Sequence, residues 1–306
     1  MQKTIRSSVS FSGKGLHSGK PATVTILPAG AEHGIWFHRT DVSKDGVIPA
    51  RYDAVRQSPL CTFLENGSGA SVSTVEHLMA ALAGCGVHNA LIEVDGPEIP
   101  ILDGSAVPFL RGIMAKGLRT LPAPVRALEV LKEVRVEKGD ASAVIGPSEI
   151  MKIDFHIDFD DPAIGRQSKS LNMSNGSFAR ELSDSRTFCR QADVDAMLAN
   201  GLAQGGVPGQ NGVVFDGARV SSPGGLRHTD EPVRHKMLDA LGDLALAGAP
   251  LIGHYTGVKA GHAVTNDLLL KLFSTPDAVR MIVCDASTAS RLPGHGLVWD
   301  EIPAVA

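Results

Sequence analysis

Short blocks of alternating or helically spaced hydrophobic residues make up the first third of the chain. Residues 22–27 and 35–38 are rich in β-branched and aromatic side chains and lie between Gly and Pro residues, which predicts strands. Residues 90–94 predict a further strand, and residues 109–116 predict a helix that ends at Gly117. This part of the sequence therefore consists mostly of short strands, with a few helices between them.

The most apolar helix is predicted over residues 74–83. Ser73 and Glu76 have the S-x-x-E spacing of a capping box, and Gly84 is a suitable stop. The core stripe has i, i+3, i+4, i+7 spacing and consists of Val75, Leu78, Met79 and Leu82. Alanines fill most other positions, so we expect this helix to be buried on more than one face.

The pattern of strands followed by helices begins again after residues 118–127, which contain two prolines and no periodicity. Residues 127–137 and 152–159 alternate between polar and apolar side chains, which predicts half-buried strands. Helices are predicted over residues 193–200, 231–247 and 266–273. We therefore predict an α+β fold with two domains, residues 1–121 and 126–306, each a sheet-plus-helix layer.

The helix predicted over residues 231–247, with Asp230 as its N-cap, has two stripes. The apolar stripe consists of Val233, Met237, Leu241 and Leu244. His235, Asp239 and Asp243 form a polar stripe at i, i+4 and i+8. A histidine and a carboxylate one turn apart can bind one metal ion, because their side chains meet on the same face. The alternative is a surface helix with i, i+4 ion pairs, and the spacing alone leaves both open.

Combining the two helices favours a catalytic metal site. Three of their side chains are suitable zinc ligands, namely His77, His235 and Asp239. Three protein ligands are typical of catalytic zinc, and Glu76 beside one of them is placed to accept a proton from water. Asp243 could orient a second histidine, for which His262 ahead of the last helix is the candidate. Taken singly, Glu76 could instead be a helix cap and His262 an exposed loop residue.

Composition and charge narrow the class of protein. The 306 residues include 29 Lys and Arg against 33 Asp and Glu, a net charge of −4, which excludes the strongly basic surface of a general nucleic-acid-binding protein. Hydrophobic residues make up 43% and charged residues 20% of the chain, which is typical of a globular protein. The longest nearly apolar stretch, residues 244–253, has about half of the ~20 residues that a membrane helix needs.

The start of the chain and its cysteines indicate the compartment. Residues 1–15 contain no apolar segment or cleavage signal of a secretory leader. The cysteines have no C-x-x-C spacing and are Cys61, Cys85, Cys189 and Cys284. This distribution argues against a disulfide framework and against a Cys-rich zinc module. We therefore expect a cytoplasmic protein with no integral membrane span and no nucleic-acid partner.

Long motifs follow one another along nearly the whole chain, from Gly15-Leu16-His17 to the last predicted helix. They are STVEHL and AALAG within residues 73–84, PEIPILDGS at 97–105, SRTF at 185–188, VRHKMLDALGDL at 233–244 and GHA at 261–263. Together they resemble the signatures of the LpxC-type UDP-3-O-acyl-N-acetylglucosamine deacetylases, the zinc amidases of lipid A biosynthesis in Gram-negative bacteria. Motifs of this length in this order are far more specific than a three-residue metal pattern.

The resemblance implies a fold, a cofactor and a reaction. The fold would be a two-domain α+β sandwich in which the helices of the two domains face each other. One zinc ion would be bound by His77, His235 and Asp239. The enzyme would remove the N-acetyl group of UDP-3-O-acyl-N-acetylglucosamine, giving acetate and UDP-3-O-acyl-glucosamine. We expect a monomer whose partner is this acylated UDP-amino-sugar.

The resemblance also implies a role for each catalytic residue. Glu76 would be the general base, and His262 would be the cation that stabilises the oxyanion or protonates the leaving amine. Asp243 would hold His262 in place. Thr187 would donate its hydroxyl to the oxyanion, and Lys236 would contact the sugar nucleotide. Whether Glu76 alone or the Glu76–His262 pair transfers the protons is left open by the sequence.

Residues 188–216 match an insert of the family that forms an apolar passage for the acyl chain. The residues expected to line or flank it are Val194, Met197, Leu198, Leu202 and Val207. The expected substrate contacts are Leu16, Cys61, Phe188, Val194, Gly206, Val207 and Lys236. Alternatively, the apolar residues of the insert only pack it onto its own domain. A zinc amidase for another acylated amino sugar and a non-catalytic sugar-nucleotide-binding protein are the competing functions.

Overall fold

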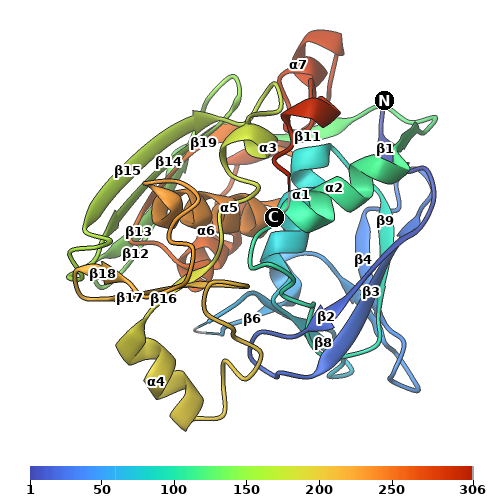
Figure 1. Ribbon diagram of the computed structural model, residues 1–306. Helices are drawn as coiled ribbons and strands as arrows, with labels where there is room; N and C mark the ends of the chain where they lie inside the picture. Colours follow the sequence, from blue (N-terminus) through green and yellow to red (C-terminus); the bar gives the residue numbers. More distant parts are fainter. Residues whose placement is uncertain (59, 305–306) are drawn as a thin grey trace.

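The computed structural model describes residues 1–58 and 60–304 and confirms the predicted α+β architecture. Figure 1 shows two sheets on opposite sides of the molecule, with helices of both parts of the chain facing each other between them. No helix among the described residues has the length and apolar character needed to cross a membrane.

The first part of the chain, through residue 120, contains the sheet on one side of the molecule. Its strands are β1 (Lys3–Ile5), β2 (Val9–Lys14), β3 (Pro21–Pro28), β4 (Ile35–Arg39), β5 (Val47–Pro49), β6 (Val55–Arg56), β7 (Phe63–Glu65), β8 (Ser71–Ser73), β9 (Ala90–Val94) and β10 (Leu118–Thr120). Its helices are α1 (Glu76–Cys85) and α2 (Val107–Lys116). The main sheet has the order β2-β3-β9-β4-β5, and β6-β7-β8 and β1-β10 form two smaller sheets.

The second part of the chain forms a seven-stranded sheet and a small three-stranded one. Its strands are β11 (Arg126–Val130), β12 (Val134–Lys138), β13 (Ala141–Gly146), β14 (Met151–Asp158), β15 (Arg166–Asn172), β16 (Phe188–Arg190), β17 (Val213–Asp216), β18 (Arg219–Val220), β19 (Leu251–Val258) and β20 (Val279–Val283). Its helices are α3 (Ser177–Glu181), α4 (Gln191–Ala199), α5 (Glu231–Ala245), α6 (His262–Ser274) and α7 (Ala286–Ser290). The large sheet has the order β12-β13-β19-β11-β20, and β14 pairs with β19 and with β15.

Within the described residues, each sheet draws its strands from one side of residues 121–125 only. The end of the chain nevertheless returns to the first part. Arg111 of α2 donates to the carbonyl oxygens of Ile302 and Pro303 at 3.1 and 2.9 Å, and its guanidinium lies over the ring of Trp299. The domain limits 1–121 and 126–306 stay a prediction, and this tail packs across them.

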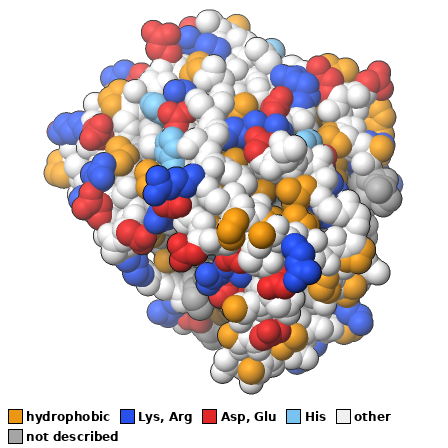
Figure 2. All heavy atoms as spheres, turned by 60° about the vertical axis from the view of Figure 1, so that its left-hand side comes forward, with side chains coloured by type: hydrophobic (Ala, Val, Ile, Leu, Met, Phe, Trp, Pro, Cys, Tyr) orange, Lys and Arg blue, Asp and Glu red, His pale blue; other side chains and the backbone are white. Residues whose placement is uncertain are grey.

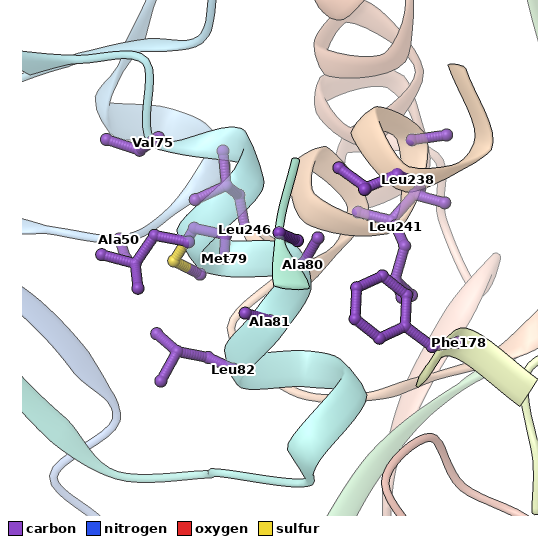
Figure 3. Packing of buried hydrophobic residues seen from close by; sticks show 14 of the residues in the cluster. Ala50, Val75, Met79, Ala80, Ala81, Leu82, Phe178, Leu238, Leu241 and Leu246 are labelled. Atoms are coloured by element: carbon purple, nitrogen blue, oxygen red, sulfur yellow. The ribbon is translucent and has the colours of Figure 1, made fainter. Parts of the chain in front are cut away.

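Helices α1 and α5 are in close contact at the centre of the molecule. A Cβ atom on Gly242 would lie 2.1 Å from the carbonyl oxygen of Glu76, so only glycine allows this approach. Figure 3 shows Ala80 of α1 on the side that faces Leu241 of α5, with Phe178 beside Leu241. Every residue of α1 except Ala83 is buried, which confirms that this helix is covered on more than one face.

The start of α1 differs from the predicted capping box. The N-cap residue is Val75, whose apolar side chain cannot accept a hydrogen bond. Ser73 is not the N-cap, because it belongs to β8 and is separated from the helix by Thr74, which has a φ of 59°. The Ser73 hydroxyl donates to the carbonyl of Pro97 instead. The Glu76 carboxylate is therefore not used for capping and is available to the site.

Three further predictions need correction. Residues 127–137 form two strands, because β11 lies next to β19 and β20 whereas β12 pairs with β13 at the other edge of the sheet. Helix α6 begins at His262 rather than at residue 266, so this histidine is the first residue of a helix and not a loop residue. Asp230 makes no side-chain cap on α5, because its carboxylate pairs with Arg234 and Lys169.

Candidate metal centre

The three predicted metal ligands meet at the contact between α1 and α5. His77 comes from the first turn of α1, and His235 and Asp239 lie one turn apart on α5. Asp239 Oδ1 lies 3.5 Å from His77 Nε2 and 3.4 Å from His235 Nε2. The ligand atoms all lie within 4.8 Å of one another, and the three residues are buried. Residues 158 positions apart in sequence thus face one point.

The chemistry of these atoms fits a cation. Among the described residues, Asp239 Oδ1 has no hydrogen-bond partner, although it is buried. The Nδ1 of His235 donates to the carbonyl of Ser185 at 2.9 Å, which leaves the lone pair of Nε2 directed toward Asp239. Burial lowers the pKa of His235 to about 4, so its imidazole is neutral at physiological pH. Burying a carboxylate oxygen without a hydrogen bond costs free energy, and a neutral imidazole lone pair facing it does not offset that cost. A metal ion bound between them would satisfy both atoms.

Lys236 supports this carboxylate from the other side. Its Nζ donates to Asp239 Oδ2 at 2.8 Å, and the lysine side chain is 19% exposed. The family resemblance implies that Lys236 contacts the sugar nucleotide, and in the structure its ammonium group binds Asp239, a candidate metal ligand. The bond fixes which oxygen of Asp239 faces the two histidines.

A second cluster of ionisable groups lies beside the metal ligands. His262 Nδ1 lies 2.8 Å from Asp243 Oδ2, and His262 Nε2 lies 3.8 Å from Glu76 Oε1. Asp243 follows Asp239 by one turn of α5, so the polar stripe of this helix serves both clusters. The structure thus places His262 between two carboxylates, with the Asp243 bond setting the orientation of the ring.

Charge and burial act on this pair in opposite directions. Burial disfavours the imidazolium of His262, but the carboxylates of Asp243 and Glu76 outweigh it and raise its pKa to about 9. Burial raises the pKa of Glu76, and the positive charge of His262 opposes that rise. At neutral pH the structure therefore favours a protonated histidine next to a buried carboxyl group.

The two clusters open onto one small cavity of about 30 Å³. Its lining consists of Leu16, His17, Leu60, Thr74, Glu76, His77, Ile101, Thr187, His235, Asp239 and His262. Thr187 is fixed there by its backbone, which donates to Gly104 O and accepts from Val213 N at 2.8 Å each. The structure thus brings the metal ligands, Glu76, Thr187 and His262 to one space.

His17 is a cavity residue that sequence reasoning missed. Within the described chain neither of its ring nitrogens has a hydrogen-bond partner, although both are buried. Glu98 fixes its backbone by accepting from His17 N at 2.9 Å and from Ser18 N at 2.8 Å. Its place in the motif Gly15-Leu16-His17 was the available signal, since no helical or strand spacing connects it to the site.

Of the expected substrate contacts, Leu16 lines this cavity, whereas the others are not part of its lining. Cys61 is buried, and burial raises the pKa of its thiol to about 11. Phe188 opens β16, and its ring centroid lies 6.4 Å from that of His235 with the rings nearly perpendicular. Gly206 lies next to Leu16, whose Cδ1 would be 3.8 Å from a Cβ on that glycine.

The insert is the most exposed of these regions. Helix α4 buries none of its residues and projects from the body of the molecule in Figure 1. Val194 of α4 and Val207 lie outside the cavity lining, and Val207 is 43% exposed. Figure 2, which brings this side forward, shows hydrophobic side chains grouped on the lower part of the face among charged ones. The acyl passage along the insert therefore stays a prediction.

Known proteins match the chain over both of its parts. Residues 2–274 match the family model described as LpxC: UDP-3-O-acyl N-acetylglycosamine deacetylase. A protein of Phenylobacterium zucineum named UDP-3-O-acyl-N-acetylglucosamine deacetylase is 47% identical over 92% of this chain and 96% of its own length. Proteins of the same name from Shewanella frigidimarina and Shewanella oneidensis are 44% and 43% identical, over 93% and 97% of this chain and 93% and 99% of theirs.

Proposed function

The chain belongs to the LpxC family of UDP-3-O-acyl-N-acetylglucosamine deacetylases, and from this premise we propose how its own residues perform the reaction. It is a metalloenzyme of lipid A biosynthesis, a hydrolase that acts on an amide bond. We propose that it removes the N-acetyl group of UDP-3-O-acyl-N-acetylglucosamine, releasing acetate and the free 2-amino sugar nucleotide.

The metal in this proposal is one zinc ion, held by His77, His235 and Asp239. One observation supports it above all others: two imidazole nitrogens converge on a buried carboxylate oxygen that has no hydrogen bond within the described residues. Nitrogen and oxygen ligands in this number are typical of catalytic zinc. When bound, zinc supplies a Lewis acid that acidifies water and polarises a carbonyl group.

Proton transfer is the task of the second cluster. Glu76 would accept the proton of the attacking water, since its carboxylate lines the cavity next to the metal ligands. His262 would be the protonated partner, because Asp243 and Glu76 favour its charged form. This imidazolium would stabilise the oxyanion or give its proton to the departing amine. Two groups in opposite protonation states are what amide hydrolysis at neutral pH requires.

Thr187 and the insert would complete substrate binding. The Thr187 hydroxyl faces the cavity from a backbone fixed at both sides, so it would donate to the oxyanion with little reorganisation. Residues 188–216 would accommodate the acyl chain, and Leu16 with Phe188 would contact the part nearest the sugar. One chain supplies every residue that this proposal assigns to catalysis, and the monomeric state stays a prediction.

The decisive experiment measures zinc content and acetate release together. We expect about one zinc per chain, loss of acetate release after a chelator, and recovery on adding one equivalent of zinc. The same acetylated sugar nucleotide without its 3-O-acyl chain should be a much poorer substrate. Equal rates with both substrates would indicate an amidase for another amino sugar, and no acetate from either would refute the proposal.

A further inference from the structure

Thr62 lies between the two carboxylates of the acid–base cluster and belongs to neither of the helices that carry them. It directly precedes β7 and is 3% exposed. Its backbone N–H donates to Glu76 Oε2 at 3.1 Å, and its hydroxyl donates to Asp243 Oδ1 at 2.5 Å. One residue therefore binds both carboxylates through two different donors.

The remaining oxygen of each carboxylate faces His262. Asp243 Oδ2 lies 2.8 Å from His262 Nδ1, and Glu76 Oε1 lies 3.8 Å from His262 Nε2. Thr62 and His262 thus contact the same two carboxylates from opposite sides and close a ring of four residues. With one oxygen fixed by Thr62, each carboxylate can turn its other oxygen only toward the histidine.

We propose that Thr62 is a positioning residue for deacetylation, holding Glu76 and Asp243 at the separation that lets His262 bridge them. The inference rests on the proposed roles of these three residues. Thr62 is not part of the cavity lining, so it acts through its neighbours rather than on the substrate.

The location of Thr62 in the chain supports this role. Thr62 and Asp243 are 181 positions apart, so their hydrogen bond joins the first part of the chain to α5. Glu76 also belongs to the first part, and α5 approaches it through Gly242. Backbone packing alone would leave the Asp243 carboxylate free to rotate about its side-chain bonds. The Thr62 hydroxyl therefore fixes the position of this carboxylate relative to Glu76. A β-branched threonine suits the task because its χ1 angle is restricted.

Thr62→Val distinguishes the contributions of the two Thr62 donors, the backbone N–H and the hydroxyl. Valine keeps the shape of the side chain and the backbone N–H and removes only the hydroxyl. We expect kcat to fall about 10- to 100-fold, as for the loss of a hydrogen bond to a charged group, with KM within about twofold of wild type. Zinc content should stay at one per chain. Thr62→Ser keeps the hydroxyl and should recover most of kcat. Should the valine protein not fold, Thr62→Ala removes the same hydroxyl without adding volume.

A double-mutant cycle with Asp243→Ala distinguishes positioning from general loss of structure. In the Asp243→Ala background, Thr62→Val should lower kcat less than about twofold, because its partner is already absent. The free energies of unfolding of the same four proteins measure the Thr62–Asp243 coupling in the absence of substrate. Thr4→Val removes another buried hydroxyl, which accepts from Ala29 N, and should change stability without changing kcat.

Two results would overturn the inference. One is a Thr62→Val enzyme with wild-type kcat, and the other is an equal loss of kcat with and without Asp243. An inactive wild-type enzyme would instead contradict the proposed function, and the unfolding cycle would still report whether Thr62 and Asp243 are coupled.

Discussion

The contact between α1 and α5 and the insert at residues 188–216 differ in how firmly packing fixes their side chains. At the helix contact, His77 and His235 are 4% and 2% exposed, and the Nε2 atoms of both face Asp239 Oδ1. In the insert, α4 buries no residue, and Leu198 is 49% exposed. The first region holds the groups that we propose to react, and the second is the proposed binding region of the acyl chain.

The difference follows from what each region must do. Proton transfer and metal binding need atoms held within fractions of an ångström, which only a dense core provides. A flexible acyl chain is bound by apolar area, and that area must be free before the substrate arrives. Substitutions at the helix contact should therefore change metal binding, kcat and stability, whereas substitutions in the insert should change chain-length preference alone.

The largest effect should come from removing two metal ligands. We expect the double variant His77→Ala, His235→Ala to lose essentially all of its zinc, because one carboxylate cannot hold the ion alone. Metal analysis of the purified protein measures this. The control variant His156→Ala, His254→Ala removes two histidines of the large sheet and should keep one zinc per chain. Stoichiometric zinc in the first variant would show that the ligands lie elsewhere.

Glu76→Ala should give the next largest effect. Loss of the base should lower kcat by about 10²- to 10⁴-fold while zinc stays bound, since Glu76 is not one of the three ligands. Rate measurements and metal analysis on one preparation separate these quantities. Glu93→Ala, on the partly exposed β9, is the matched control and should leave both unchanged. If Glu76→Ala lost zinc as well as activity, Glu76 would have to be one of the metal ligands.

The pH profile tests the pairing of Asp243 with His262. His262 must be protonated to act, so the rate should fall as the pH rises through its pKa of about 9. Asp243→Ala removes a charge that raises this pKa, so the alkaline limb should move to lower pH. Asp154→Ala breaks an aspartate–histidine contact remote from the cavity and should leave the limb in place.

His262→Gln identifies the group responsible for that limb. If His262 is the titrating acid, the alkaline limb should flatten in the variant, because glutamine has no proton to lose in this range. A limb that stays near pH 9 would assign it to another group and would remove the acid role of His262.

A smaller effect is expected from the helix contact itself. Gly242→Ala places a methyl group against the backbone of Glu76, so α1 and α5 must separate, and we expect a loss of about 1–3 kcal/mol in the free energy of unfolding. Denaturant unfolding measures this. Gly67→Ala meets no atom within 4 Å and serves as the control. An unchanged denaturant midpoint for Gly242→Ala would mean that α1 and α5 are not in close backbone contact at this position.

The smallest effect on stability should come from the insert. Val207→Ser and Leu198→Ser should change the free energy of unfolding by less than about 0.5 kcal/mol, because both side chains are exposed. In the wild-type enzyme each added CH₂ of the acyl chain should contribute up to ~0.8 kcal/mol to kcat/KM, and these variants should flatten that dependence. Met281→Ser, an exposed position on β20, is the control. A steep dependence that survives both substitutions would place the acyl chain elsewhere.

Local sequence determined the helix positions that carry the chemistry. The i, i+4, i+8 spacing of His235, Asp239 and Asp243 puts them on one face of α5 by helix geometry alone, and the structure confirms that face. The apolar, alanine-rich stretch around Glu76 and His77 likewise required a deeply buried helix. The proposed set of metal ligands could be inferred at this level because each helix supplies its residues as a rigid unit.

Only the tertiary structure decided which partners these side chains have. Glu76 fits a capping box in sequence, yet its carboxylate binds the N–H of Thr62, because the backbone turn at Thr74 prevents the cap. The contact of Thr62 with Asp243 also has no signature in residue spacing. The local sequence pattern determines which face of a helix a side chain occupies. The partner of that side chain depends on where folding places a second segment of the chain. For this protein that placement rests on the close approach of α1 and α5 at Gly242.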